Sequence, residues 1–419
     1  MQRRVFVKSG ALALVTMGLS PSFLRRTAFA AALPAAQQGK VLVCLFQRGA
    51  ADALNVVVPH GERAYYDLRP NIAIPRPLAS NPLTAIDLDG FYGLHPALAP
   101  LGRLYNDGML APIHAVGSPS ATRSHFDAQD YMESGTPDRK STREGWLNRF
   151  LAVKGTCEEC NLSPFRAVSM TAQTPRILEG PSPAVAMSSL GTFSVQATGT
   201  SADRLEALYR TGSADLVHAS GKEMFDAVKM LASANPARYS AGNGAEYPRS
   251  QFGQRLKEIA QLIKSNLGLE IAFADVGGWD THVNQGAATG QLAVRLRDFA
   301  DSIYAFVTDM GDRMDDCLVL TMSEFGRMAR QNGTGGTDHG HAGAMFAIGG
   351  AVRGGKVHGR WPGLEREQLF EGRDLALTTD FRAVFSEVLT THLGATDLSA
   401  VFPGFDAKRL EWPGILRST

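Results

Sequence analysis

Apolar residues follow two alternating patterns along the chain. Nearly continuous apolar runs of about four to eight residues, closed by glycine or polar residues, are typical of buried strands. Such runs lie within residues 41–46 (VLVCLF), 110–117 (LAPIHAVG), 269–282 (LEIAFADVGGWDTH), 317–327 (CLVLTMSEFGR) and 344–350 (AMFAIGG). Between them, apolar residues recur three or four positions apart, which predicts amphipathic helices within 95–108, 250–268, 290–312 and 380–394.

The alternation of strands and helices predicts the fold class. It favours a three-layer α/β fold with a mainly parallel central sheet and helices on both faces. We expect a single domain over residues 40–415, preceded by a Gln/Ala-rich linker at 31–39. Residues 150–250 are less regular and include SANPARYSAGNGAEYPRS, which predicts a cap or loop insertion.

Residues 1–30 (MQRRVFVKSGALALVTMGLSPSFLRRTAFA) have a basic N-terminal region, an apolar middle region and small residues at the expected cleavage site, which is the pattern of a signal peptide. Arg3 and Arg4, followed by VFVK, resemble a twin-arginine signal, which is read by the Tat export machinery. We therefore expect a periplasmic or secreted protein. The alternatives are an ordinary secretory signal or an uncleaved anchor, although Pro21 and the short apolar stretch make a poor membrane span.

Composition and charge limit the classes of binding partner that we expect. With 419 residues, 44% of them apolar, the chain can bury a large core. Without residues 1–30 it keeps 37 basic and 41 acidic residues, a net charge of about −4, so neither nucleic acid nor, after signal cleavage, a membrane is an expected partner. Cys157 and Cys160 (CEEC) form a candidate structural disulfide in an oxidising compartment, whereas Cys44 and Cys317 lie in apolar runs and are expected in the core.

Polar clusters with metal-binding chemistry follow the predicted strands, where ligands gather in such sheets. In an extended chain, residues two positions apart point to the same side, so each Asp/His pair could straddle one ion. The mixture of carboxylate and imidazole suits a divalent metal, Zn before Mn or Fe. The predicted metal ligands are Asp52, Asp280, His282, Asp338, His339 and His341.

Each of these clusters also has a plainer interpretation. Asp52 could cap a short helix, and an Asp-X-His pair in a loop is often a turn-stabilising acid beside a surface imidazole. Ser124 could likewise cap the helix that follows it. It is also the candidate nucleophile, because a hydroxyl at a helix start lies where backbone N–H groups attract an anion. Thr122 is the competing candidate.

Other residues complete the predicted chemistry. His125 is placed beside Ser124 as a catalytic proton carrier. Arg123 and Arg327 are additional candidates for holding the oxygens of an anionic substrate.

Four stretches, FQRGAADALNVVVP, SHFDAQDYMESGTP, GGWDTH and SEFGR…NGTGGTDHGHAG…GGAVRGGKVHGRWPGL, resemble the bacterial family called domain of unknown function 1501, whose members are usually exported by the twin-arginine route. The likeness runs from about residue 40 to residue 405. That family is in turn distantly similar to the alkaline phosphatase and sulfatase superfamily. The similarity implies an alkaline-phosphatase-like fold with one or two metal ions, and it places Asp52, Ser124 and the later Asp/His pairs in the site.

The sequence departs from the superfamily in three places. Asp280 stands only two residues before His282, and SEFG occupies the strand end where an Asp-His pair is usual, which makes Glu324 an additional candidate ligand. The Cys/Ser-X-Pro-Ser-Arg motif of formylglycine sulfatases is not matched by TRSHF. The leading hypothesis is an exported metal-dependent hydrolase of small phosphate or related anionic esters. The alternative is a non-catalytic periplasmic binding or assembly protein on the same scaffold.

Overall fold

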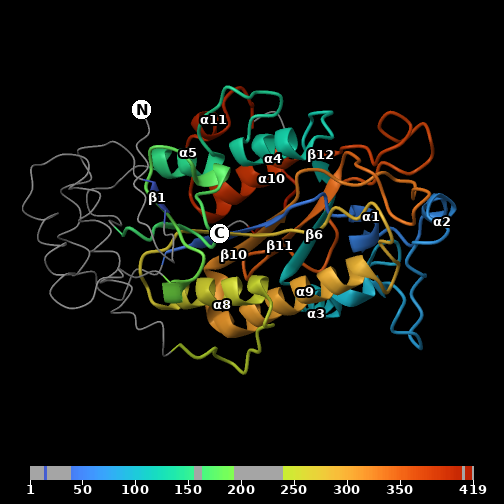
Figure 1. Ribbon diagram of the computed structural model, residues 1–419, viewed down its shortest axis with the longest axis horizontal. Helices are drawn as coiled ribbons and strands as arrows, with labels where there is room; N and C mark the ends of the chain where they lie inside the picture. The colour runs from blue at the N-terminus through green and yellow to red at the C-terminus, as the bar shows by residue number, and fades with distance from the viewer. Residues whose placement is uncertain (1–13, 17–38, 155–162, 193–238, 408–410, 418–419) are drawn as a thin grey trace, which may run out of the picture.

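The computed structural model describes residues 14–16, 39–154, 163–192, 239–407 and 411–417 (Figure 1). Most of the predicted signal peptide and linker, and the CEEC pair, lie outside the described residues. None of the described helices has the length and apolar character that a membrane span requires.

A nine-stranded sheet in the order β1-β8-β7-β9-β2-β10-β11-β6-β12 forms the centre of the fold. The pairs β8–β7, β7–β9, β9–β2, β2–β10 and β6–β12 are parallel, while β1–β8, β10–β11 and β11–β6 are antiparallel. The predicted mainly parallel sheet is thus confirmed. Its strands are β1 Leu14–Thr16, β2 Val41–Gln47, β6 Leu110–Gly117, β7 Ala167–Ser169, β8 Ala184–Ala186, β9 Ile271–Val276, β10 Cys317–Met322, β11 Gly343–Ile348 and β12 Thr379–Asp380.

Helices cover both faces of this sheet (Figure 1). The α-helices are α1 Ala53–Val56, α2 Arg63–Leu68, α3 Ala99–Asn106, α4 His125–Ser134, α5 Trp146–Val153, α8 Gln251–Lys264, α9 Gln291–Met310, α10 Phe381–Glu387 and α11 Leu398–Val401. Shorter turns are η3 Pro96–Leu98, η4 Arg176–Leu178, η5 Leu190–Thr192, η7 Gly311–Asp315 and the π-helical η8 Val388–His392. A small second sheet joins β3 Val57–Val58, β5 Gly93–Leu94 and β4 Ile86–Asp87.

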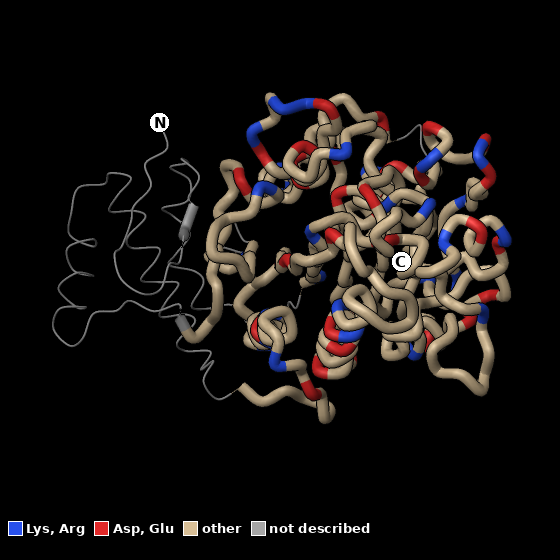
Figure 2. Tube along the Cα trace, turned by 45° about the vertical axis from the view of Figure 1, so that its right-hand side comes forward, with Lys and Arg blue, Asp and Glu red and all other residues tan. Residues whose placement is uncertain are grey.

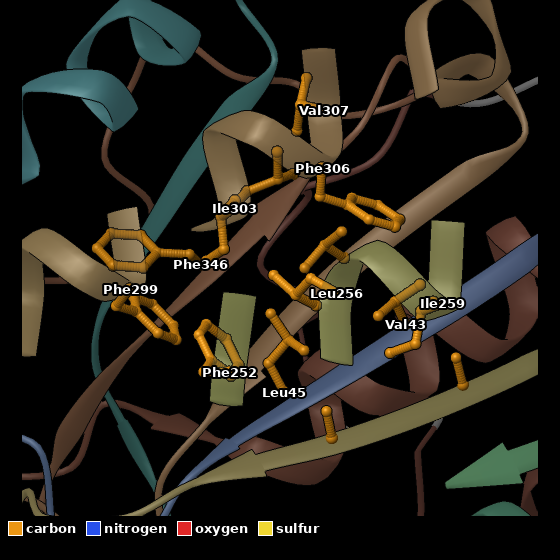
Figure 3. Packing of buried hydrophobic residues seen from close by; sticks show 14 of the residues in the cluster. Val43, Leu45, Phe252, Leu256, Ile259, Phe299, Ile303, Phe306, Val307 and Phe346 are labelled. Atoms are coloured by element: carbon orange, nitrogen blue, oxygen red, sulfur yellow. The ribbon is translucent and has the colours of Figure 1, made fainter. Parts of the chain in front are cut away.

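Strand β2 shows why the layers form. Its side chains alternate between the two faces, and both faces are buried, as a continuous apolar run predicts. Val43 and Leu45 pack with Phe252 and Leu256 of α8 and with Phe299 of α9 (Figure 3). The intervening residues of β2 belong to a second core that includes residues of α5 and α10. Cys44 and Cys317 are buried in these two cores, as predicted.

The described part of residues 150–250 contributes β7 and β8 to the central sheet. Beyond the undescribed residues 193–238, the chain is held to α9 by buried Asp309, whose carboxylate accepts hydrogen bonds from Tyr239, Tyr247 and Lys264.

Three buried histidines of the described residues have a strongly lowered pKa. Burial lowers the pKa of each of these buried histidines to about 4, so the neutral ring is the form that the fold accepts. They are His95, His114 and His392. On the outside, acidic and basic residues are interspersed in the view of Figure 2.

Candidate metal centre

The candidate site lies at the edge of the sheet where the parallel strands end. The loops that follow β2, β6, β9 and β10 all leave the sheet there. Strand β11 runs antiparallel to β10 and therefore begins at this same edge. The loop that leads into β11 carries residues 338–341. Its direction explains how TDHGH, which comes well after SEFG in the sequence, returns to the strand ends.

Four side chains meet at one point of this edge. His125, Asp280 and His339 offer ligand atoms that all lie within 4.8 Å of one another. Asp280 Oδ1 is 3.5 Å from His125 Nε2 and 3.2 Å from His339 Nε2. His282 borders this group, because its Nε2 is 3.0 Å from both Asp280 Oδ1 and His339 Nε2. We call these four residues the central cluster.

Each imidazole of the central cluster has an oxygen atom at its Nδ1. His125 Nδ1 lies 2.8 Å from Glu324 Oε1, and His282 Nδ1 lies 3.0 Å from Asp338 Oδ1. His339 Nδ1 lies 2.9 Å from the carbonyl oxygen of Arg123. In the tautomer that donates its Nδ1 proton to this oxygen, each ring keeps its lone pair on Nε2. With this tautomer, three lone pairs are directed toward Asp280.

The convergence fits a cation. His125 Nε2 is buried without a hydrogen-bond partner, which is uncommon for a buried polar atom. The Nε2 atoms of His282 and His339 cannot bond to each other when both protons sit on Nδ1. Atoms that share one tetrahedral zinc ion lie about 3.3 Å apart. The distances of 3.0 to 3.5 Å around Asp280 Oδ1 are close to this value.

The ionisation states of Asp280, Glu324 and His339 agree with this assignment, and that of His125 opposes it. Burial opposes the charged form of Asp280, but the hydrogen bond and charge of Arg327 outweigh it and hold the pKa of the carboxyl below its usual value. Burial also opposes the charge of Glu324, yet hydrogen bonds from His125 and Gln129 lower its pKa. Burial lowers the pKa of His339 and favours the neutral ring. The hydrogen bond with Glu324 raises the pKa of His125, so a proton competes with a metal for this ligand.

The side chain of Arg327 is buried and holds the loops of the site. Its side chain has no exposed surface, and Nη2 lies 2.5 Å from Asp280 Oδ1. Other N–H groups donate to the backbone carbonyls of Gly49, Ala50, Trp279 and Thr337, and Nη1 also lies 3.5 Å from Nε2 of His282. The guanidinium therefore fixes the loops after β2 and β9 against each other.

Asp52 is not brought into the central cluster. Its two carboxylate oxygens lie 2.6 and 2.9 Å from the guanidinium of Arg69, and both side chains are fully buried. Gln285 Nε2 donates to the same carboxylate at 2.6 Å. A carboxylate that is neutralised on both oxygens is a weak candidate for a metal ligand.

The remaining predicted residues have other partners. Ser124 is the N-cap of α4, and its Oγ accepts from Asp127 N at 3.5 Å, as the plainer interpretation expects. The side chain of Arg123 is paired with Asp374 and Glu371. His341 stacks on Phe370 with the ring centroids 4.1 Å apart. Glu324 and Asp338 support histidines from the outer side of the central cluster.

Gln285 joins the two loops that carry the ligands. Its Oε1 accepts the hydroxyl of Thr281 at 2.8 Å and that of Thr337 at 2.9 Å. Thr281 stands between Asp280 and His282, and Thr337 directly precedes Asp338. One buried amide therefore sets the position of one loop relative to the other.

Two glycines let these loops approach closely. A Cβ on Gly336 would overlap the carbonyl group of His282, and a Cβ on Gly340 would overlap the backbone of Arg327. Because neither position has room for a side chain, the glycines of GTGGTDHGHAG serve the packing of loop on loop. They bring His339 to the central cluster.

Sequence reasoning did not identify three of the supporting residues. Gln285 is a neutral amide in a loop, and Gln129 is a polar residue in a helix, so neither carries a local signal. Asp374 lies far along the chain, where it is fully buried between Arg123 and Arg373. Arg373 also donates to the carbonyl of His339 at 2.8 Å.

The sequence profile described as "Protein of unknown function (DUF1501)" matches residues 110–402, which is more than two thirds of the chain. The match includes all four residues of the central cluster. Comparison with curated proteins finds no match. The chain therefore belongs to the DUF1501 family.

Proposed function

We propose that the central cluster binds a divalent metal ion and that the protein is an exported metal-dependent hydrolase of phosphate or related anionic esters. One observation supports the metal most directly: three imidazoles, each with an oxygen at Nδ1, turn Nε2 toward a single carboxylate oxygen. Zinc suits three imidazoles and one carboxylate best, and Mn or Fe(II) would also accept them. His125, Asp280 and His339 would be the first ligands, with His282 beside them.

A bound ion of this kind polarises the oxygen of an ester and lowers the pKa of a water molecule, and hydrolysis adds that water across the ester P–O bond to give an alcohol and phosphate. The residues around it would position and move protons. His282 and Asp338 are partly exposed, with side-chain exposures of 39% and 50%, so this pair can exchange a proton with solvent or with a leaving alcohol. Ser124 remains a helix cap in this proposal.

The subcellular location is proposed from the sequence. Arg3 and Arg4 with the following apolar stretch support export by the Tat machinery to the periplasm or beyond. A protein that is exported already folded could take up its ion before export. The distant likeness to alkaline phosphatases and sulfatases supports the ester class and remains part of the proposal.

Metal analysis and a substrate panel test the proposal together. The purified protein should contain about one or more stoichiometric equivalents of a divalent metal, and H339A should lose it while H60A, which removes an imidazole bonded to Asp87, should keep it. The metal-loaded protein should cleave at least one phosphate monoester, phosphate diester or sulfate ester. A wild-type chain without bound metal after incubation with Zn, Mn and Fe(II) would sink the proposal.

One observation favours a non-catalytic binding or assembly protein as the second candidate. Two carboxylates of the site region, Asp52 and Asp280, are paired with buried arginines, which leaves fewer free anionic ligands than a two-ion centre needs. A metal-loaded chain that cleaves no ester of the panel, while an anion raises its melting temperature, would favour this candidate.

A further inference from the structure

Helix α4 carries three polar side chains at four-residue intervals. His125, Gln129 and Glu133 stand on one face of the helix, because residues four positions apart lie one above the other. His125 belongs to the central cluster, Gln129 is half-buried and Glu133 is buried. This face of α4 therefore leads from the central cluster to a buried carboxylate.

Two side chains from other elements bridge these three residues. Glu324, which follows β10, bridges the first two: its Oε1 is 2.8 Å from His125 Nδ1 and 2.9 Å from Gln129 Nε2. Arg48, which follows β2, bridges the next two: its Nη1 donates to Gln129 Oε1 at 3.0 Å and to Glu133 Oε1 at 2.9 Å. The five side chains form one continuous series of hydrogen bonds, which we call the α4 ladder.

Each contact of the α4 ladder fixes the direction of the next. Arg48 has only donors, so the amide oxygen of Gln129 must face it and the NH2 group must face Glu324. Glu324 is held in its ionised form by hydrogen bonds that lower its pKa. An ionised carboxylate has only acceptors, so His125 must donate to it from Nδ1. The amide of Gln129 and the ring of His125 thus each have one orientation that satisfies the ladder.

Arg48 also contacts the strand that leads to Asp280. Its Nε donates to Asp275 Oδ2 at 2.7 Å, and Arg255 of α8 donates to the other oxygen of that carboxylate at 3.1 Å. Asp275 belongs to β9, and the loop after β9 carries Asp280. A single guanidinium therefore holds the helix that carries one residue of the central cluster against the strand that leads to another.

We propose that Arg48 and Gln129 are positioning residues of the central cluster, which act through Glu324 to hold the ring of His125 and which fix α4 relative to β9. The inference rests on the proposed function only for the metal, because the α4 ladder orients His125 with or without an ion. The contact that supports it most directly is shared: Gln129 donates to the same Glu324 oxygen that accepts from His125. Neither positioning residue needs to contact an ion or a substrate.

The substitution Q129M tests the inner part of the α4 ladder. Methionine fills a similar space without the amide, and the Glu324 oxygen and the Arg48 guanidinium both keep other hydrogen bonds. Q129M should therefore fold, with the melting temperature of the metal-free chain close to that of wild type. Q254M is the matched control, because it removes an α8 amide that donates to the carbonyl of Pro248, outside the ladder.

Two measurements on the full chain report on His125. In the metal-free protein its Nδ1 proton should give a slowly exchanging downfield resonance in the proton NMR spectrum, which H125A removes and thereby assigns. Q129M should shift or broaden this resonance, and R48K, which keeps the charge but replaces the planar fork with one nitrogen, should do so as well. Zinc affinity against a competing chelator should fall roughly three- to tenfold in Q129M, at or below the lower end of the loss usual for residues that support a metal-binding histidine. Q254M should change neither quantity.

The outcomes separate this inference from the proposed function. A wild-type spectrum without a resonance that H125A removes, or an unchanged resonance in Q129M, would overturn the α4 ladder, as would an unchanged affinity in Q129M where wild type binds zinc. A resonance that changes in Q129M but not in R48K would overturn the part of Arg48. If Q129M alters the resonance and wild type binds no zinc, the ladder stands and the metal centre is refuted. Should Q129M not fold, Q129N, which shortens the reach of the amide, takes its place with the same expectations.

Discussion

Replacement of Glu324 by Gln is the sharpest perturbation of the proposed metal centre. Glu324 is fully buried, and its Oε1 accepts hydrogen bonds from His125, Gly49 N and Gln129 at 2.8 to 2.9 Å. A glutamine oxygen at the same place keeps these three bonds. The new NH2 group would face Ser323 Oγ, which can accept it while donating to the backbone as before. E324Q should therefore fold normally.

The substitution removes the charge behind His125. A hydrogen bond to a charged group contributes about 1.5–3 kcal/mol, against about 0.5–1.5 kcal/mol for a neutral one. The expected loss is thus about 1–2 kcal/mol, and since about 1.4 kcal/mol corresponds to a factor of ten, metal affinity should fall roughly 5- to 30-fold. This range overlaps the 10- to 100-fold effect that is usual for residues supporting a metal-binding histidine.

The assay is a zinc titration of the metal-free chain against a competing chelator. E387Q is the matched control, because Glu387 is also buried and accepts backbone N–H groups, from residues 414 and 416, outside the central cluster. An affinity of E324Q within twofold of wild type, with an unchanged melting temperature, would refute the view that Glu324 supports a metal ligand through His125.

Three further predictions follow from the same structure. The pKa of buried His95, His114 and His392 is about 4 in the fold, against 6.5 for the free side chain, so the unfolded chain binds more protons between these pH values. The free energy of unfolding should therefore fall by about 2 kcal/mol per histidine from pH 7 to pH 5. A denaturant midpoint that does not change with pH would contradict this prediction. D374N should weaken zinc binding several-fold, because Asp374 holds Arg123 and Arg373, which both hydrogen-bond to His339. D380N, which removes a carboxylate paired with Arg382, should leave zinc binding unchanged. G336A should abolish zinc binding and lower the melting temperature, because the added Cβ would collide with the His282 backbone. G333A is the control and should leave both properties unchanged, because Gly333 has open space around it. Equal zinc affinities for the two variants would count against loop packing as the reason for Gly336.

The layers of the fold could be predicted from the sequence because each strand is an uninterrupted apolar run. The runs at 41–46 and 110–117 became β2 and β6 with nearly the predicted bounds. The direction of β11 could not be predicted, since apolar periodicity does not distinguish parallel from antiparallel pairing. The strands β7 and β8 were missed because each has only three residues.

For the site, position after a strand was informative, and residue type alone was not. The sequence singled out the four residues that the structure brings together as the central cluster. It could not show that Arg69 and Arg327 neutralise carboxylates, because a buried arginine and an exposed one look the same in a sequence. The two-residue spacing of His339 and His341 suggested a shared direction, but the chain between them is not a regular strand, and His341 stacks on Phe370 instead.

The place of β2 in the sheet matters for anyone who shortens this chain for study. The family match begins at residue 110, after β2, yet β2 pairs with β9 on one side and β10 on the other over six positions each. A protein trimmed to the matched residues would have an open gap in the middle of its sheet and would lack the carbonyl groups of Gly49 and Ala50 that hold Arg327. The smallest fragment that can keep the candidate centre intact therefore starts before Val41, well outside the stretch by which the family is recognised.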